Sequence, residues 1–204
     1  MIKEFNIFIA GVGGQGVILV SELLGNAAVS EGLEVRGSEI LGMAVRGGSV
    51  ISTIRLGSDV YGPLVPEGKG DLMIGMEAAE ALRNITYMSE SSIIVLNAQQ
   101  VVPVMVLLGK THYPSLEEIV EKLEKQSERV IKLDATQLAE KAGSSLSANI
   151  VMLGASFGTG RIPLKLETIK KTVAEHFSAK LAPVNLRAFD LGYEFSQKAL
   201  SVKF

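Results

Sequence analysis

A glycine-rich loop, Gly11-Val12-Gly13-Gly14-Gln15-Gly16, lies between two apolar segments and constrains the fold more than any other feature of the chain. The preceding run, Phe5–Ala10, is short, apolar and rich in residues that favour strands, so it predicts a buried strand. The next segment, Val17–Glu31, has the length of a helix and is apolar around most of its circumference, with Gly32 placed to end it. A second strand is predicted at Leu33–Arg36. Strand, glycine turn, buried helix and strand together indicate a βαβ opening.

The rest of the chain alternates apolar strands with amphipathic helices. We expect an irregular loop over Gly37–Ser49, then a strand at Val50–Leu56 whose Gly57-Ser58-Asp59 turn forms an antiparallel hairpin leading to Val60. The further strands are expected at Asp71–Met76, Ser92–Asn97 and Val130–Leu133, and the further helices at Glu77–Met88, Leu116–Glu128 (with Ser115 as N-cap), Ala135–Ala142, Asn149–Phe157, Leu164–Phe177 and Asn185–Ala199. No repeat or linker interrupts the pattern. Residues 1–204 therefore predict a single three-layer α/β/α domain with a mostly parallel, Rossmann-like sheet and one antiparallel excursion.

The composition excludes several kinds of site. Twenty basic and 22 acidic side chains give a net charge of −2 without a run of like charges, so no nucleic-acid or membrane partner is expected. The chain has no cysteine, which excludes a thiolate nucleophile and any Cys-ligated cluster built by this chain alone. His112 and His176 form no helical metal pair, and we expect ordinary surface or packing roles for both. The apolar stretch Val101–Leu108 is too short to cross a bilayer, so a cytoplasmic protein is expected.

The glycine loop fits the pattern G-x-G-x-x-G through Gly11, Gly13 and Gly16. Three interpretations remain open: a tight packing turn without a ligand, a phosphate or pyrophosphate site at the positive end of the following helix, and a contact with another subunit. A dinucleotide site also needs an acidic residue at the end of the second strand, and neither Glu34 nor Glu39 is well placed for that role.

A second candidate site is the segment Arg46-Gly47-Gly48-Ser49. The arginine offers a planar charged fork and the glycines expose backbone donors, which suits carboxylate or phosphate groups; the alternative is a flexible loop with a surface arginine. No nucleophile–base pair is evident in the sequence, so we do not expect the chain to catalyse a reaction alone. Weaker candidates are Glu77 and Glu80, which we expect to cap the start of a helix, and Asn149, which we expect to be the N-cap of its helix. Asn97 and Gln99 are expected at the end of a buried strand, a common ligand position in open α/β sheets.

Three motifs in one order carry a family resemblance. They are the glycine loop continued to Val17, the segment Gly42–Val50, and Asn149–Ala155. This series resembles the gamma-type subunit or domain of 2-oxoacid:ferredoxin oxidoreductases, and in particular the beta subunit of the indolepyruvate branch. The likeness extends from about Phe5 to Phe195 and includes Ser38–Val50, Gly75–Arg83, Tyr113-Pro114 and Asn185–Gly192.

The resemblance implies a subunit that is inactive alone. In that family the holoenzyme decarboxylates an arylpyruvate or another 2-oxoacid oxidatively, transfers the acyl group to coenzyme A and reduces ferredoxin. Thiamine diphosphate and four-iron four-sulfur clusters lie on the large alpha subunit, so no cofactor is expected on this chain. The implied partners are the alpha subunit, ferredoxin through the holoenzyme, and the 2-oxoacid substrate. The isolated chain could form a homodimer.

The two candidate motifs are expected to act together. We predict that Gly13, Gly14, Gln15 and Gly16 line one edge of the sheet with Arg46, Gly47, Gly48 and Ser49, where they contact the large subunit or the anionic part of a substrate. An obligate subunit also exposes an apolar patch, expected at Leu41–Val45 and Pro63–Pro66. The alternatives are a stand-alone nicotinamide- or flavin-binding Rossmann-type oxidoreductase and a non-catalytic nucleotide-binding regulator.

Overall fold

The computed structural model describes residues 2–110 and 112–201. Within these ranges six strands form one sheet, in the order β2-β3-β1-β4-β5-β6. The strands are β1 (Phe5–Val12), β2 (Val35–Leu41), β3 (Ser49–Leu56), β4 (Gly70–Gly75), β5 (Met88–Asn97) and β6 (Arg129–Leu133).

The strand directions confirm a mostly parallel sheet. The parallel pairs are β1 with β4, β4 with β5, and β5 with β6. Among the described strands, β3 alone points in the opposite direction to the others. It lies between β1 and β2 and is antiparallel to both. The antiparallel excursion predicted near Val50–Val60 is present as β3 alone, which ends at Leu56 and separates the two strands of the opening βαβ unit.

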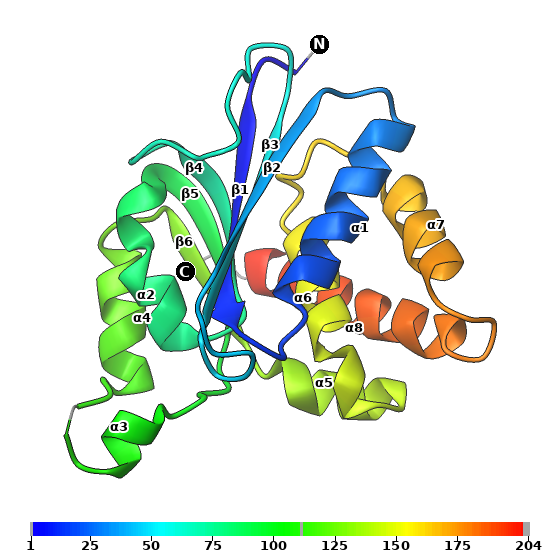
Figure 1. Cartoon of the computed structure of the whole chain (residues 1–204). Helices are drawn as coiled ribbons and strands as arrows, with labels where there is room; N and C mark the ends of the chain where they lie inside the picture. Colours follow the sequence, from blue (N-terminus) through cyan, green and yellow to red (C-terminus); the bar gives the residue numbers. More distant parts are fainter. Residues whose placement is uncertain (1, 111, 202–204) are drawn as a thin grey trace.

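Helices cover both faces of the sheet, as Figure 1 shows. Their bounds are α1 (Val17–Ser30), α2 (Ala78–Arg83), α3 (Val104–Leu107), α4 (Leu116–Glu124), α5 (Ala135–Ala142), α6 (Ala148–Gly158), α7 (Leu166–His176) and α8 (Ala182–Ser201), with short 3-10 turns η1 (Ile85–Tyr87) and η2 (Ser145–Ser147). In the figure, α1 and α5 to α8 lie on one side of the sheet, and α2 and α4 on the other. The expected three-layer α/β/α fold is confirmed. No helix of the described residues is long and apolar enough to span a membrane.

Alternating side chains of β1 divide the core between the two helical layers. Ile7 and Ile9 are fully buried in the larger cluster, which includes side chains of α1, α6 and α8. Phe8 and Ala10 point to the opposite face and join the cluster formed with α2 and α4. Because both faces of the central strand are covered, its apolar run is nearly continuous, which is the pattern that the sequence shows.

Two glycines allow α6 and α8 to cross at unusually short range. A Cβ atom added at Gly154 would lie 2.0 Å from the carbonyl oxygen of Phe189, and one at Gly192 would lie 2.0 Å from that of Val151. The two backbones therefore touch without intervening side chains. This contact fixes the position of α6, whose first turn reaches the glycine loop.

Two predicted elements near the antiparallel strand are wrong in detail. The second strand runs over Val35–Leu41 rather than Leu33–Arg36, because its backbone pairs with β3 from Val35 opposite Leu56 to Leu41 opposite Val50. The hairpin loop of this pair is residues 42–48, and Gly57-Ser58-Asp59 starts no second hairpin. The backbone N–H groups of Ser58 and Asp59 instead donate to the carbonyls of Ile2 and Lys3.

Several helix ends also differ from the prediction. The helix expected over Glu77–Met88 ends at Arg83, because the Asn84 side chain donates to the carbonyl oxygen of Glu80 and the chain continues as a 3-10 turn. The helix expected over Leu116–Glu128 ends at Glu124. Its predicted N-cap, Ser115, is confirmed and forms a capping box with Glu118.

Candidate functional site

The glycine loop and the 42–48 hairpin loop lie against each other at the carboxyl edge of the sheet. The backbone N–H of Gly13 donates to the carbonyl oxygen of Gly48 at 2.8 Å, and the N–H of Gly47 donates to that of Gly13 at 3.2 Å. A Cβ atom at Gly13 would lie only 2.4 Å from the carbonyl oxygen of Val45. The structure thus brings the two predicted motifs together, and the close approach explains why position 13 requires glycine.

Gln15 braces the glycine loop from inside. Its Oε1 accepts a hydrogen bond from the backbone N–H of Val12 at 2.9 Å, and its Nε2 donates to the carbonyl oxygen of Met76 at 3.1 Å. A Cβ atom at Gly11 would lie 2.8 Å from this Oε1. The glutamine therefore joins the ends of β1 and β4, and both of its polar atoms are engaged within the fold.

The first turns of α1 and α6 meet at Gly16 and Asn149. Gly16 has a φ of 77°, which favours glycine, and a Cβ atom there would lie 2.2 Å from Asn149 Nδ2. Asn149 is not the N-cap predicted from the sequence, because Ser147 holds that position. Its side chain lies against the glycine loop instead. Gly14, with a φ of 98°, has no atom within 4 Å of an added Cβ and faces open space.

Two cavities border Gly14. One, of about 300 Å³, has a mixed polar and apolar lining without any charged side chain; it is lined by Gly14, Gln15, Met76, Asn97, Gln99, Thr136, Ser145, Leu146, Ala148, Asn149 and Met152. The other, of about 530 Å³, lies between the glycine loop and the hairpin and is mainly apolar; it is lined by Val12, Gly13, Gly14, Gly16, Val17, Ile18, Leu41, Gly42, Ala44, Val45 and Val50. The first suits a hydrogen-bonding group, and the second suits an apolar side chain of another molecule.

The two ends of the Arg46–Ser49 segment have different surroundings. Arg46 is exposed, and the part of the chain that the structure describes provides it with no hydrogen bond or ion pair. Ser49 is anchored, since its Oγ donates to Glu80 Oε2 at 2.7 Å, and Glu80 also pairs with Arg83 at 2.9 Å. The arginine head group can therefore reach an anion outside the chain while the base of its loop stays fixed.

Glu77 is a buried carboxylate that binds three donors. As the sequence predicts, it caps α2: its Oε2 accepts from the backbone N–H of Glu80 at 3.0 Å. Its Oε1 accepts from the backbone N–H of Val101 at 3.3 Å and from the hydroxyl of Tyr113. Burial, followed by the hydrogen bond to Glu77, raises the pKa of Tyr113 above its usual value. Sequence reasoning missed this cluster because its members are far apart along the chain.

The other weak candidates have structural partners. Asn97 Oδ1 accepts from the backbone N–H of Ala135 at 3.2 Å, and its Nδ2 donates to the carbonyl oxygen of Met76 at 3.3 Å. Gln99 accepts from the Thr136 hydroxyl at 2.6 Å. His112 and His176 are exposed, and no cluster of three or more metal-binding side chains occurs in residues 2–110 and 112–201.

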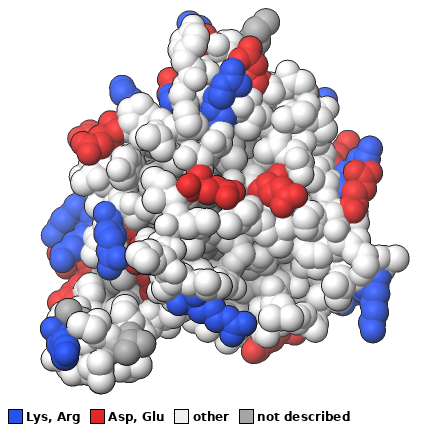
Figure 2. Space-filling model, viewed as in Figure 1, with Lys and Arg blue, Asp and Glu red and all other residues white. Residues whose placement is uncertain are grey.

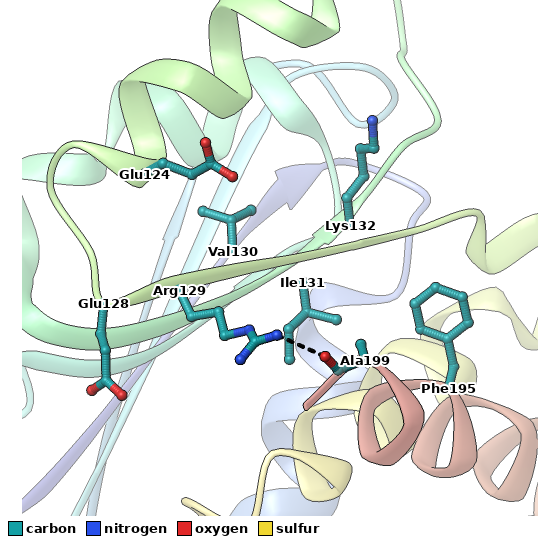
Figure 3. A pocket seen from close by; sticks show the side chains of 8 residues that line it. All are labelled: Glu124, Glu128, Arg129, Val130, Ile131, Lys132, Phe195 and Ala199. Atoms are coloured by element: carbon teal, nitrogen blue, oxygen red, sulfur yellow. Dashed lines mark hydrogen bonds between the residues drawn. The ribbon is translucent and has the colours of Figure 1, made fainter. Parts of the chain in front are cut away.

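A further cavity, of about 600 Å³, lies away from the glycine loop at the edge strand β6. Figure 3 shows the Arg129 side chain directed toward α8, where its guanidinium donates to the carbonyl oxygen of Ala199 at 2.7 Å. Glu128, also on this cavity, forms an ion pair with Arg161. These contacts tie the edge of the sheet to its neighbours.

The charges and the site together define a class of protein. Figure 2 shows acidic and basic groups scattered between wide uncharged areas on this face, without an extended patch of one sign. The carboxyl edge carries a glycine loop held by hydrogen bonds to a hairpin, an exposed arginine and two open cavities. This is a Rossmann-like α/β domain whose glycine loop and hairpin loop are exposed at the carboxyl edge of the sheet.

Comparisons with known proteins give the family. Residues 6–195 match the family model described as pyruvate ferredoxin/flavodoxin oxidoreductase. The indolepyruvate oxidoreductase subunit IorB of Pyrococcus horikoshii is 42% identical over 201 residues, covering 98% of this chain and 100% of the relative. The chain belongs to the pyruvate ferredoxin/flavodoxin oxidoreductase family, which confirms the resemblance drawn from the motifs.

Solved structures share the fold. Pyruvate oxidoreductase subunit PORC from Thermotoga maritima superposes with a TM-score of 0.70 at 23% identity, over 95% of this chain and 97% of that one. A 2-oxoglutarate:ferredoxin oxidoreductase from Magnetococcus marinus superposes with a TM-score of 0.71 at 22% identity, over 97% of this chain but 32% of that one. The same fold thus occurs both as a separate chain and within a longer polypeptide.

Proposed function

We propose that this chain, as one gamma-type domain over residues 1–204, is the small subunit of a 2-oxoacid:ferredoxin oxidoreductase that acts on indolepyruvate and other arylpyruvates. The observation that carries the proposal is the 42% identity to an indolepyruvate oxidoreductase subunit over the full length of that relative. The reaction would decarboxylate the 2-oxoacid oxidatively, form the acyl-coenzyme A and pass two electrons to ferredoxin.

The cofactor chemistry belongs to the partner in this proposal. A four-iron four-sulfur cluster needs thiolate ligands, and the chain contains no cysteine, so its residues do not fit such a cluster. Thiamine diphosphate and the clusters are accordingly assigned to the large alpha subunit, with coenzyme A as a co-substrate. This chain would bind and orient, and ferredoxin would be reached through the holoenzyme.

We assign the contact with the large subunit, or with the anionic part of a substrate, to the glycine loop and the hairpin loop. Gly14 is the open position of the glycine loop, and Arg46 is the exposed cation beside it. The positive ends of α1 and α6 lie next to each other at this point, which favours a negative group. The exposed side chains of Leu41, Met43 and Val45 add apolar area on the hairpin.

A stand-alone dinucleotide enzyme is not favoured by this geometry. In such enzymes an acidic residue at the end of the strand next to β1 binds the ribose. Here the strand that follows the glycine loop and α1 is β2, and β3 separates it from β1. Glu34 precedes β2 and Glu39 lies within it, so neither occupies the expected position.

The test is co-expression with the large, cysteine-rich subunit, followed by purification and an assay of ferredoxin reduction dependent on indolepyruvate and coenzyme A. We expect a stable complex whose activity requires this chain. Arg46→Ala should lower the activity of the complex without changing the unfolding of the isolated chain, and Arg36→Ala, an exposed arginine at the other end of β2, is the matched control. Unchanged steady-state kinetics for Arg46→Ala would remove the assigned role of Arg46. A chain that stays alone and retains a nicotinamide or flavin would refute the proposal.

A further inference from the structure

An exposed apolar segment follows β5 on the same edge of the sheet as the glycine loop. We call residues 101–110, which include α3, the α3 segment. Five of its apolar side chains are between 37% and 73% exposed: Val101, Val102, Met105, Leu107 and Leu108. Figure 1 shows the segment projecting from the body of the molecule. A run of large apolar side chains left in water is typical of a surface that another molecule covers.

The α3 segment and the 42–48 hairpin loop stand on one edge of the sheet. The hairpin loop leads into Ser49, which pairs with Val12 at the carboxyl end of β1, and the α3 segment follows Asn97 at the carboxyl end of β5. Leu146, which is also exposed, lies on η2 just before α6. The Pro63–Pro66 loop, which was expected to contribute to an apolar patch, is tied to the sheet instead: Pro63 accepts from the Thr53 hydroxyl, and Val65 is buried in the core cluster with Phe8.

Two buried carboxylates on α2 hold the bases of both projections. Glu80 accepts from Ser49 at the base of the hairpin loop. Glu77 accepts from the backbone N–H of Val101, the first residue of the α3 segment, and from the hydroxyl of Tyr113, which follows the segment. Glu77 and Glu80 are 2% and 6% exposed and lie one helical turn apart. A buried hydrogen-bonded carboxylate is costly to displace, so this pair fixes the two projections relative to each other.

The charge of these projections specifies the surface that they fit. Residues 40–48 contain Arg46 as their one charged side chain, and residues 98–110 contain Lys110 as theirs. Neither stretch has a carboxylate, although the whole chain carries a net charge of −2. The complementary surface is therefore apolar with carboxylates at its border. A second copy of this edge would bring like charges together instead.

We propose that the α3 segment is a docking element for the large subunit of the oxidoreductase, and that Glu77 is the residue that positions it beside the hairpin loop. This inference rests on the proposed function. The occupant follows from the charge of the two projections: each is apolar with one cation and no carboxylate, which fits an apolar surface of the large subunit bordered by carboxylates and disfavours a second copy of the same edge.

The first test compares Leu107→Asp with Val29→Asp in binding to the purified large subunit. Both residues are apolar and more than 60% exposed, but Val29 lies near the end of α1 away from the carboxyl edge. A carboxylate at position 107 would be buried in the contact and would face the carboxylates of the partner, so we expect the Kd to rise at least tenfold. The control should change the Kd less than twofold.

The second test separates positioning from folding. Tyr113→Phe removes one hydroxyl from the Glu77 cluster, and Glu77→Gln leaves one acceptor oxygen where the carboxylate uses two, because an amide nitrogen cannot accept. We expect faster hydrogen exchange at the Val101 amide and a higher Kd for both variants, and an unchanged Val101 amide and Kd in Glu77→Gln would overturn the positioning role of Glu77.

The outcomes distinguish this inference from the proposed function. If the wild-type chain does not bind the large subunit, the proposed function fails. If the wild type binds and Leu107→Asp binds equally well, the docking role of the α3 segment is overturned while the proposed function stands. If Leu107→Asp abolishes only self-association of the isolated chain, the edge is covered by a second copy and the inference is also overturned.

Discussion

Replacing Gly13 by alanine should release the hairpin loop from the glycine loop. The added Cβ would lie 2.4 Å from the carbonyl oxygen of Val45, about 1 Å inside ordinary van der Waals contact, so the hairpin loop must move outward. That movement breaks the two hydrogen bonds that join Gly13 to Gly47 and Gly48. At about 1 kcal/mol each, their loss amounts to about 2 kcal/mol, or a ~30-fold shift toward the released loop.

Hydrogen exchange measures this shift in the isolated chain. We expect protection of the Gly47 amide to fall by about 30-fold in Gly13→Ala, with little change in the amides of β4 and β5, because the hairpin loop is exposed and the core is untouched. The Kd for the large subunit should rise correspondingly. Gly25→Ala is the control, since an added Cβ there meets no atom within 4 Å. Unchanged protection at Gly47 would refute the argument that Gly13 holds the two loops together.

Three further perturbations test the fold around the site. Gly154→Ala should lower the free energy of unfolding in urea by about 3 kcal/mol, because its Cβ would overlap the Phe189 carbonyl at the α6–α8 crossing; a change below 0.5 kcal/mol (about the usual surface effect) would contradict that packing. Ser115→Ala should cost about 1 kcal/mol through loss of the α4 capping box, and no loss of stability would mean that the box is not formed in solution. The pKa of Tyr113 is raised in the folded chain, so ionisation of this tyrosine in the unfolded chain lowers the free energy of unfolding once the pH exceeds the unfolded pKa of about 10. Urea denaturation from about pH 8 to about pH 11 should therefore show a steeper loss of stability for wild type than for Tyr113→Phe. Parallel profiles for the two proteins would refute this.

Local patterns predicted the elements whose stability depends on neighbours along the chain. The apolar run before the glycine loop and the apolar helix after it are both present, as is the N-cap of α4 at Ser115. Both predicted bounds of the helix Ala135–Ala142 are confirmed. Asp134 caps its first turn and Gly143 caps its end, and both are neighbours along the chain.

Long-range pairing decided the features that the sequence did not reveal. Residues 37–41 lack apolar alternation, and they form a strand because β3 supplies their hydrogen-bond partners. The Gly57–Asp59 turn looks like a hairpin locally, but its N–H groups bind the carbonyls of the chain's first residues.

The same limit applied to the site. The pattern placed the glycine loop and the Arg46–Ser49 segment on one edge, and their direct hydrogen bonds follow from the sheet order. It did not reveal that the Gln15 side chain is hydrogen-bonded inside the fold, because its partner Met76 follows β4 and is 61 residues away along the chain. Glu77 was read as a helix cap, which it is, but its link to Tyr113 required the tertiary structure.

The most direct test of the central claim is reconstitution of the oxidoreductase from separately purified parts. Increasing amounts of this chain are added to a fixed amount of the large subunit, and indolepyruvate- and coenzyme A-dependent reduction of ferredoxin is measured. We expect negligible activity for either part alone and activity that rises to a plateau at a fixed molar ratio of the two. Full activity of the large subunit without this chain, or no activity at any ratio while the two form a complex, would contradict it.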